Sequence, residues 1–351
     1  MKGQGARAAL RRRGSSCALV CWAPIVQGGR TLAALLAAGI CEPARVAVAQ
    51  GVDDLRDRAR ELVRGSGLGD QLVGLSGFAA LPGISAATFK VDPGDGPDTD
   101  IDRLILPLSH QFRGPRLLGG APYVEATLGY SRVEQSARIG DGAPGETRLD
   151  QSLTTLSALG GLGLGFEPVK GITLRPLGLL GYAHTDDDAD LDGPGASALE
   201  PVLDGILLNF TADELLYGGA IEIEHERTVG GLELTISARY NHLWGTTLDA
   251  SDEALEGDTD FGIFTAATSL DGPLPITALG RELRWIAFVT HSRFPGLSGD
   301  ALGFDYFFEL GGGLELVDRG IVTGIEGVSL RASYILGDNV TGFSVGAQLE
   351  F

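Results

Sequence analysis

The chain has little cysteine, and all of it lies near the amino terminus. Cys17, Cys21 and Cys41 fall within the first 41 of 351 residues. If this region is a leader that is removed, the remaining chain has no disulfide, no thiolate metal site and no cysteine nucleophile. It must then be held together by backbone pairing and side-chain packing.

Basic residues are also scarce beyond the amino-terminal region. After Ala49 the chain has 20 Lys and Arg residues against 45 Asp and Glu residues, a formal net charge of −25. Such a chain repels polyanions, so we expect no nucleic-acid partner. No stretch after residue 50 reaches the apolar length of a membrane-spanning helix, so a membrane form of this chain must be a closed β-barrel.

The first 49 residues have the pattern of a secretory signal peptide. Five basic residues, Lys2, Arg7 and Arg11 to Arg13, precede a short apolar stretch at residues 31–41 and an Ala-Val-Ala pattern at residues 47–49. These are the three parts of an export signal, and they predict a mature chain that begins near Gln50. The alternative is an ordinary soluble amino terminus.

The last twelve residues alternate strictly between apolar and polar or small side chains. Phe343, Val345, Ala347, Leu349 and Phe351 fall on one face of an extended strand, and Gly342, Ser344, Gly346, Gln348 and Glu350 fall on the other. Alternation of this kind suits a barrel strand with one face toward lipid and the other toward a lumen. The last strand of a soluble antiparallel sheet would read the same way.

Alternation recurs along the chain and decides the fold class. At residues 232–244 the apolar face ends in Tyr240 and Trp244, which suits an interfacial aromatic girdle. We predict an all-β fold, a twelve-stranded antiparallel transmembrane β-barrel with a short N-terminal helix. The predicted strands lie near residues 82–91, 102–112, 121–133, 151–166, 171–184, 212–226, 231–244, 259–270, 282–293, 304–317, 326–337 and 340–351.

The connections between these strands alternate between long or acidic segments and short glycine-rich turns. Long loops outside and short turns in the periplasm are typical of outer-membrane barrels. Two connections break the alternation. The connection at residues 271–280 is long where a short turn is expected, and the one at residues 338–339 has two residues where a long loop is expected. Pro107 and Pro176 lack a backbone donor, so we expect β-bulges at both positions.

The chain resembles the solitary outer-membrane autotransporter-like β-barrel domains of Gram-negative bacteria over residues 75–351. The resemblance rests on LILPL at residues 104–108, PYVEATLGY at 122–130, ITLRP at 172–176 with Gly181 and Tyr182, and the terminal strand. It implies a translocator-type barrel without a passenger, located in the outer membrane. The implied partners are outer-membrane lipid and the barrel-assembly machinery, which would recognise the C-terminal strand.

Residues 50–75 are predicted to form an N-terminal helix and linker, ahead of a barrel at residues 76–351. Residues 52–63 place Val52, Leu55, Ala59 and Leu62 near one side of a helix and most charges elsewhere. The resemblance implies a helix threaded through the lumen, and a twelve-stranded barrel has room for one. The alternative is a helix outside the barrel with a solvated charged face.

The inward faces of the predicted strands collect charged residues of both signs. The predicted lumen-lining residues are Glu125, Arg175, Glu222, Glu224, Glu233, Arg239, Asp305, Glu309, Glu315, Arg331 and Glu350. Acidic groups are in excess, so we expect the three arginines to link neighbouring strands. Arginines of the helix would add positive charge if it inserts. Alternatively, all these side chains face water in a wide pore.

The sequence gives only weak support for an enzymatic site or a metal site. His291 and Ser292 are neighbours on a strand and point to opposite faces, so they cannot act as base and nucleophile. His184 near a run of aspartates is similar to an omptin-type protease site, but no further motif matches. Asp188, Asp190 and Asp192 resemble the first half of an EF-hand loop, whose second half is missing. We predict no enzyme and no cofactor, with divalent cations at acidic loops as the one candidate ligand.

Three functions from different classes remain open. The first is a structural or interaction barrel with a plugged or narrow lumen. The second is an open, cation-preferring channel for small solutes, favoured by the acidic charge. The third is a hydrolase with its site at the barrel mouth.

Overall fold

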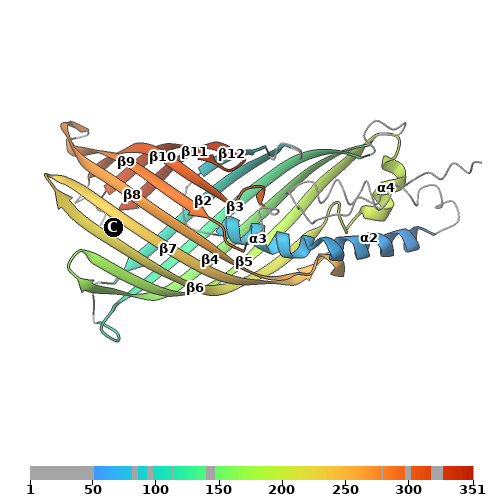
Figure 1. Cartoon of the computed structure of the whole chain (residues 1–351), viewed down its shortest axis with the longest axis horizontal. Coiled ribbons are helices and arrows are strands. Elements are labelled where there is room, and N and C mark those ends of the chain that lie inside the picture. Colours follow the sequence, from blue (N-terminus) through green and yellow to red (C-terminus); the bar gives the residue numbers. More distant parts are fainter. Residues whose placement is uncertain are drawn as a thin grey trace, which may run out of the picture.

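Twelve antiparallel strands close into a barrel (Figure 1). The barrel is closed by pairing of β1 with β12. This confirms the fold class expected from the alternating pattern. The computed structural model describes residues 51–80, 86–92, 98–112, 114, 116–139, 147–278, 280–296, 302–317 and 327–350, without the side chains of Ile139, Gln348, Leu349 and Glu350. The predicted leader, residues 1–49, lies outside the described residues.

The strands closely follow the predicted ranges, and several are longer. They are β1 (Ala86–Val91), β2 (Thr99–Gln111), β3 (Ala121–Ile139), β4 (Thr147–Val169), β5 (Ile172–Asp192), β6 (Thr211–Val229), β7 (Leu232–Ala250), β8 (Asp258–Ala278), β9 (Arg281–Arg293), β10 (Tyr306–Val317), β11 (Gly327–Gly337) and β12 (Val340–Glu350). The helices are α2 (Val52–Ser66), α3 (Leu68–Ala80) and α4 (Ala196–Leu203), with a 3-10 turn, η3 (Glu253–Leu255). Within the described chain, no helix has both the length and the apolarity to cross a bilayer.

The two ends of the barrel differ in their connections. At the turn end, only two residues separate β4 from β5, β6 from β7, and β8 from β9. At the loop end, α4 and η3 lie between strands. β8 continues to Ala278, so the predicted connection at residues 271–280 is wrong and the true turn is short, as the alternation requires. Residues 338–339 remain a two-residue turn at the loop end.

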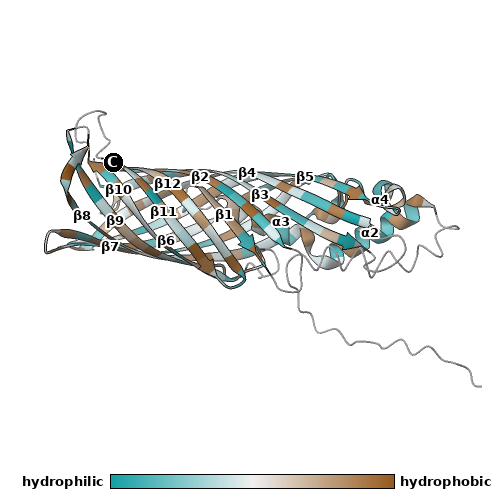
Figure 2. Ribbon diagram, turned by 90° about the horizontal axis from the view of Figure 1, so that it is seen from above, coloured by the Kyte–Doolittle hydropathy of each residue, from teal (hydrophilic) through white to brown (hydrophobic). Residues whose placement is uncertain are grey.

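Apolar residues recur along the middle of the strands (Figure 2), and many of them point outward from the barrel. Several large apolar side chains there are exposed to the surroundings of the protein, among them Leu180, Ile221, Leu330 and Val345. We call this band the lipid belt. Toward the loop end it is bordered by aromatic residues such as Tyr217 and Trp244, whose rings stack 6.1 Å apart. An exposed apolar band with aromatic borders is the surface that a bilayer requires.

The two strand prolines are accommodated differently from the predicted bulges. β2 pairs regularly with β3 at Pro107, so no bulge forms there. The β1–β2 pairing ends at Leu104, and among the described residues no strand lies opposite Pro107 on that side. The backbone nitrogen of Pro107 cannot donate, but on the β1 side of β2 this breaks no hydrogen bond between strands. Near Pro176 the β4–β5 register does shift, between Phe166 and Val169.

Candidate functional site: the occupied lumen

Helix α3 occupies the half of the lumen nearer the loop end. It contacts strands from β2 round to β8, as well as η3, and Figure 1 shows it inside the ring of strands. Nine of its thirteen residues are buried, so it has no broad solvated face. Its sequence is rich in glycine and alanine, which lets a helix lie close to the surrounding wall.

Two glycines of the wall show how closely α3 is fitted. A Cβ atom added at Gly129 of β3 would lie 1.9 Å from the carbonyl oxygen of Ala79. One added at Gly245 of β7 would lie 2.1 Å from Cγ1 of Val73. Real Cβ atoms do not approach other atoms this closely, so only glycine fits the wall at these positions while α3 is in place.

An aromatic cluster holds the C-terminal end of α3. The ring of Phe78 lies 5.9 Å from that of Phe89, 5.8 Å from Phe294 and 6.2 Å from Phe304, each with edge-to-face geometry. The guanidinium group of Arg103 lies over the Phe78 ring, 4.4 Å from its centroid. Aromatic pairs of this geometry add to the free energy of burial.

Helix α2, the segment that the sequence suggested as the lumen plug, lies outside the ring of strands at the loop end. Arg60 pairs with Asp252 beside η3 at 2.9 Å, and Arg56 donates to the carbonyl oxygen of Pro201 in α4 at 3.0 Å. The condition under which the arginines of residues 54–64 would add positive charge to the lumen, insertion of this helix, is therefore not met. The helix inside the lumen is the next one, which has no basic residue.

The carboxyl group of Glu214 faces α3 from the wall, and no cationic side chain among the described residues pairs with it. The hydroxyl group of Ser76 donates to Oε2 of Glu214 at 3.1 Å and lies 3.4 Å from the hydroxyl of Thr185. In the described chain the other Glu214 oxygen has no hydrogen-bond partner. On β6 the aromatic border of the lipid belt is Tyr217, so Glu214 lies beyond the belt, and burial raises the pKa of its carboxyl to about 8.

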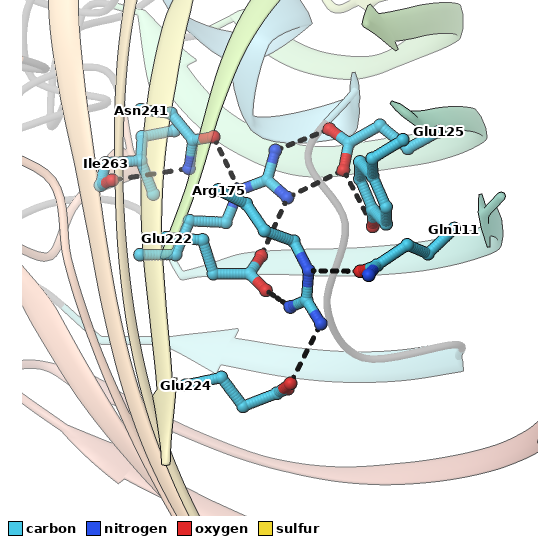
Figure 3. A network of polar contacts seen from close by, with 9 residues as sticks. Gln111, Glu125, Arg175, Glu222, Glu224, Asn241 and Ile263 are labelled. Carbon is cyan, nitrogen blue, oxygen red and sulfur yellow. Dashed lines mark hydrogen bonds and ion pairs between the residues drawn. The ribbon is translucent and has the colours of Figure 1, made fainter. Parts of the chain in front are cut away.

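The half of the lumen nearer the turn end contains a charged network (Figure 3). Arg239 donates through Nη1 to Oε2 of Glu125 at 2.8 Å and contacts Glu222 at 3.3 Å. Arg175 bonds Glu222 as well, and Glu224 at 2.9 Å. Because β3 and β7 are four strands apart, the Arg239–Glu125 pair crosses the lumen. These side chains are between 7% and 22% exposed, so the network is mostly shielded from water.

A second charged cluster lies on the adjoining part of the wall, from β7 to β10. Arg284 of β9 donates through Nε to Asp271 of β8 at 2.9 Å and lies 3.1 Å from Glu233 of β7. Glu315 of β10 is 3.8 Å from the same guanidinium group. The cluster thus links four consecutive strands.

Glu309 of β10 is buried among hydroxyl groups. Its Oε1 accepts hydrogen bonds from Ser333 at 2.5 Å and from Ser344 at 2.9 Å. These contacts join β10, β11 and β12 on the lumen side.

The other predicted lumen residues have varied surroundings. The guanidinium group of Arg331 lies 5.9 Å from the ring centroid of Phe288. Asp305 is exposed in the connection before β10, where its backbone oxygen accepts from Phe294. The side chain of Glu350 lies outside the described residues.

The sequence matches the family model described as solitary outer membrane autotransporter beta-barrel domain, over residues 99–345. The chain belongs to this family. The family resemblance inferred from the strand motifs is therefore confirmed, and the protein is an outer-membrane β-barrel of autotransporter type. No curated protein matches the chain in sequence.

Solved structures similar to this solitary autotransporter-type barrel include translocator units. The β domain of the Bordetella autotransporter BrkA is 12% identical, with a TM-score of 0.45, over 76% of this chain and 98% of that chain. The transport unit of AIDA-I from Escherichia coli is 13% identical, with a TM-score of 0.44, over 81% and 99%. The translocator domain of NalP from Neisseria meningitidis is 14% identical, with a TM-score of 0.39, over 76% and 86%.

The candidate catalytic histidines of this autotransporter-type barrel lie on its outward face. His291 stacks on Phe308 at 4.5 Å between ring centroids, while Ser292 is buried on the other face of β9. Nδ1 of His184 lies 2.6 Å from a carboxylate oxygen of Asp213. Neither histidine has a nucleophile as its neighbour in the contacts that the structure describes.

The EF-hand-like reading of the acidic segment is wrong. Asp188, Asp190 and Asp192 lie in β5, which extends beyond the predicted end at residue 184, and they alternate with inward-facing residues. Successive members of the row are therefore spread along the strand instead of converging on one point. In the described part of the chain no group of three or more His, Cys, Asp or Glu side chains could hold a metal ion.

The sequence analysis of the autotransporter-type barrel missed three residues of the lumen. Asp271 was assigned to the connection at residues 271–280, whereas β8 continues through it to Ala278. Glu214 and Arg284 fall within predicted strands on the inward face, so parity alone could have identified them. No pattern in the sequence predicted how closely the wall packs against α3.

Proposed function

We propose that this protein is a translocator-type barrel that works without an exported passenger, with its lumen closed at rest and with no catalytic reaction. It would lie in the outer membrane of a Gram-negative bacterium with the loop end outside, inserted by the barrel-assembly machinery through its C-terminal strand. The observation that supports closure is that two different layers fill the lumen one below the other. α3 fills the loop half, and the Arg239–Glu125 pair crosses the turn half.

The fit of α3 supports a fixed plug over a free passage. Gly129 and Gly245 leave no space beside the helix, and the Phe78 cluster fastens its end. A polypeptide could not pass the lumen unless α3 left it. The charged network would still cross the turn half, because its residues belong to the wall.

Conductance in planar bilayers tests this function. We expect the full chain to conduct no ions, and a variant lacking residues 51–80 to conduct in small steps limited by the Arg239–Glu125 pair. Adding Arg239→Ser to that deletion should increase the step size and favour cations, because Glu125 then faces the lumen without an arginine, while Glu222 keeps only its pair with Arg175.

A reversible lock is the matched control. Ser76→Cys with Thr185→Cys places two thiols where the hydroxyl oxygens lie 3.4 Å apart, so a disulfide would tie α3 to β5. The locked protein should remain silent under conditions, such as high voltage, that open the unlocked one, and reduction should restore opening. Large cation-selective steps from the unmodified full chain would overturn the proposal in favour of an open channel.

A further inference from the structure

Charged side chains on the outer surface of the barrel are sorted by end. Toward the loop end, exposed acidic residues predominate on the outward face, among them Asp100, Glu134, Asp186, Asp188 and Asp190. Toward the turn end, the outward-facing strand residues Arg227 and Arg281 are basic, as are Arg116 and Lys170 in the connections. The acidic strand residues at that end, Glu226, Glu233, Asp271 and Glu282, have the parity of the lumen face. Glu167 is exposed near the end of β4, where its carboxylate accepts from the backbone of Gly171 in the turn.

Each of these basic residues lies beside an exposed apolar side chain. Arg116 precedes Leu117, which is 58% exposed, and Lys170 follows Val169, which is 60% exposed. The same combination occurs in the next two turns along the chain, where Val229 is 49% exposed near Arg227, and Ile276 is 59% exposed near Arg281. Four connections at the turn end therefore share one chemistry, a cation next to an apolar group.

In the β2–β3 connection an exposed leucine occupies a backbone conformation that leucine rarely adopts. Leu117 and Gly120 exchange backbone hydrogen bonds of 2.8 and 2.9 Å, which closes a two-residue turn. Leu118 in this turn has a φ of +50° and its side chain is 86% exposed. Glycine or asparagine is the usual residue at such a φ, and water is a poor environment for leucine. An apolar medium around the turn accounts for the choice of residue.

We propose that the four turn-end connections form a binding surface for anionic phospholipids of the inner leaflet. The basic groups would contact the headgroup phosphates, and the apolar neighbours would lie among the upper acyl segments. A cation beside a leucine or valine at the border of the lipid belt has this dual preference. The assignment to the inner leaflet rests on the proposed orientation of the barrel; the binding itself does not depend on whether the lumen is closed.

Two tryptophans allow the two ends to be compared in one protein. Trp244, 44% exposed, borders the lipid belt toward the loop end, and Trp285 lies on the outward face of β9 nearer the turn end. Single-tryptophan forms of the mature chain, made with Trp244→Phe or Trp285→Phe, would be placed in phosphatidylcholine bilayers. Quenching by brominated phosphatidylglycerol, relative to brominated phosphatidylcholine, then measures anionic-lipid preference at each end.

We expect a preference for phosphatidylglycerol on the order of fivefold per basic group at Trp285, and no preference at Trp244. The triple variant Lys170→Gln, Arg227→Gln and Arg281→Gln should abolish the preference at Trp285. A matched triple variant at the loop end, Lys90→Gln, Arg132→Gln and Arg293→Gln, removes the same charge and should leave it unchanged.

Equal quenching by the two lipids at Trp285, or a preference that survives the turn-end triple variant, would overturn the proposal. Conductance of the same proteins reports the lumen separately. A silent barrel without lipid preference would refute only the lipid surface, and a conducting barrel with lipid preference would refute only the plug.

Discussion

The two halves of the lumen are filled by different chemistry. In the loop half the filling element is α3, a separate helix that meets the wall through glycines, aromatic rings and one buried carboxyl contact. In the turn half it is the wall itself, through guanidinium groups that reach carboxylates on strands up to four places away. A helix can leave as a unit, whereas side chains of the wall can only rearrange. The first layer is therefore suited to opening, and the second to bracing the barrel.

The two layers that fill the lumen should also respond differently to substitutions. Apolar contacts at packing distance tolerate almost no added volume. Buried ion pairs tolerate volume better than the loss of one charge, because the remaining charge is left unpaired in a poorly solvated site. Substitutions that add atoms should therefore affect the loop half, and substitutions that remove charge should affect the turn half.

The largest effect is expected from Arg239→Met. It leaves Glu125 without its main cation and weakens the pairing of Glu222, so the barrel should lose about 3–5 kcal/mol of unfolding free energy in urea. Arg148→Met is the control, because its pair with Asp150 is largely exposed and should contribute less than about 1 kcal/mol. Equal losses for both variants would mean that the turn-half network does not brace the barrel.

A smaller effect, confined to the loop half, is expected from Gly245→Ala. The added methyl group meets Val73, so α3 docking should weaken by about 1–3 kcal/mol, seen as faster amide exchange across residues 68–80. Val73→Ala in the same protein should restore much of the protection. Gly178→Ala, where an added Cβ has nothing within 4 Å, should have no effect. If Val73→Ala does not restore the protection lost in Gly245→Ala, the added methyl group does not act through a clash with α3.

Docking of α3 should also weaken as the pH rises. The docked state keeps the pKa of Glu214 at about 8, whereas a hydrated glutamate titrates near 4.5, so the docked state binds the proton more tightly. Docking is then strongest below pH 4.5, weakens between pH 4.5 and 8, and becomes constant above that. Amide exchange of residues 68–80 should rise at least tenfold, or about 1.4 kcal/mol, between pH 5 and pH 9 after correction for intrinsic rates. Glu214→Gln should remove this dependence, and an unchanged profile would exclude Glu214 as its source.

The smallest effect is expected from Arg60→Gln, which removes a pair between α2 and the η3 region. Exchange should become faster in α2 only, with no change in residues 68–80 or in barrel unfolding. Arg58→Gln, on the same helix, is the control. Faster exchange in both helices would show that α2 and α3 dock as one unit.

Much of the barrel could be predicted from the sequence because a membrane strand has only two faces. Leu330 and Val345 had to face lipid once their neighbours were polar or small, and Arg175, Arg239 and Glu125 had to face inward. The ends of the strands were predicted less accurately than their faces. β8 runs through Pro273 to Ala278, since pairing with β9 continues on both sides of the irregularity.

The sequence by itself determined the strand number and the two faces of each strand, because these follow from the local order of apolar and polar residues. The tertiary structure decided which helix fills the lumen, since the amphipathic pattern of α2 suits both a lumen and a loop-end cap, and only the glycine wall selects α3. It also decided that Arg239 reaches Glu125. Distances across a lumen depend on how strands close into a ring, and residues far apart in the chain carry no local pattern that reveals them.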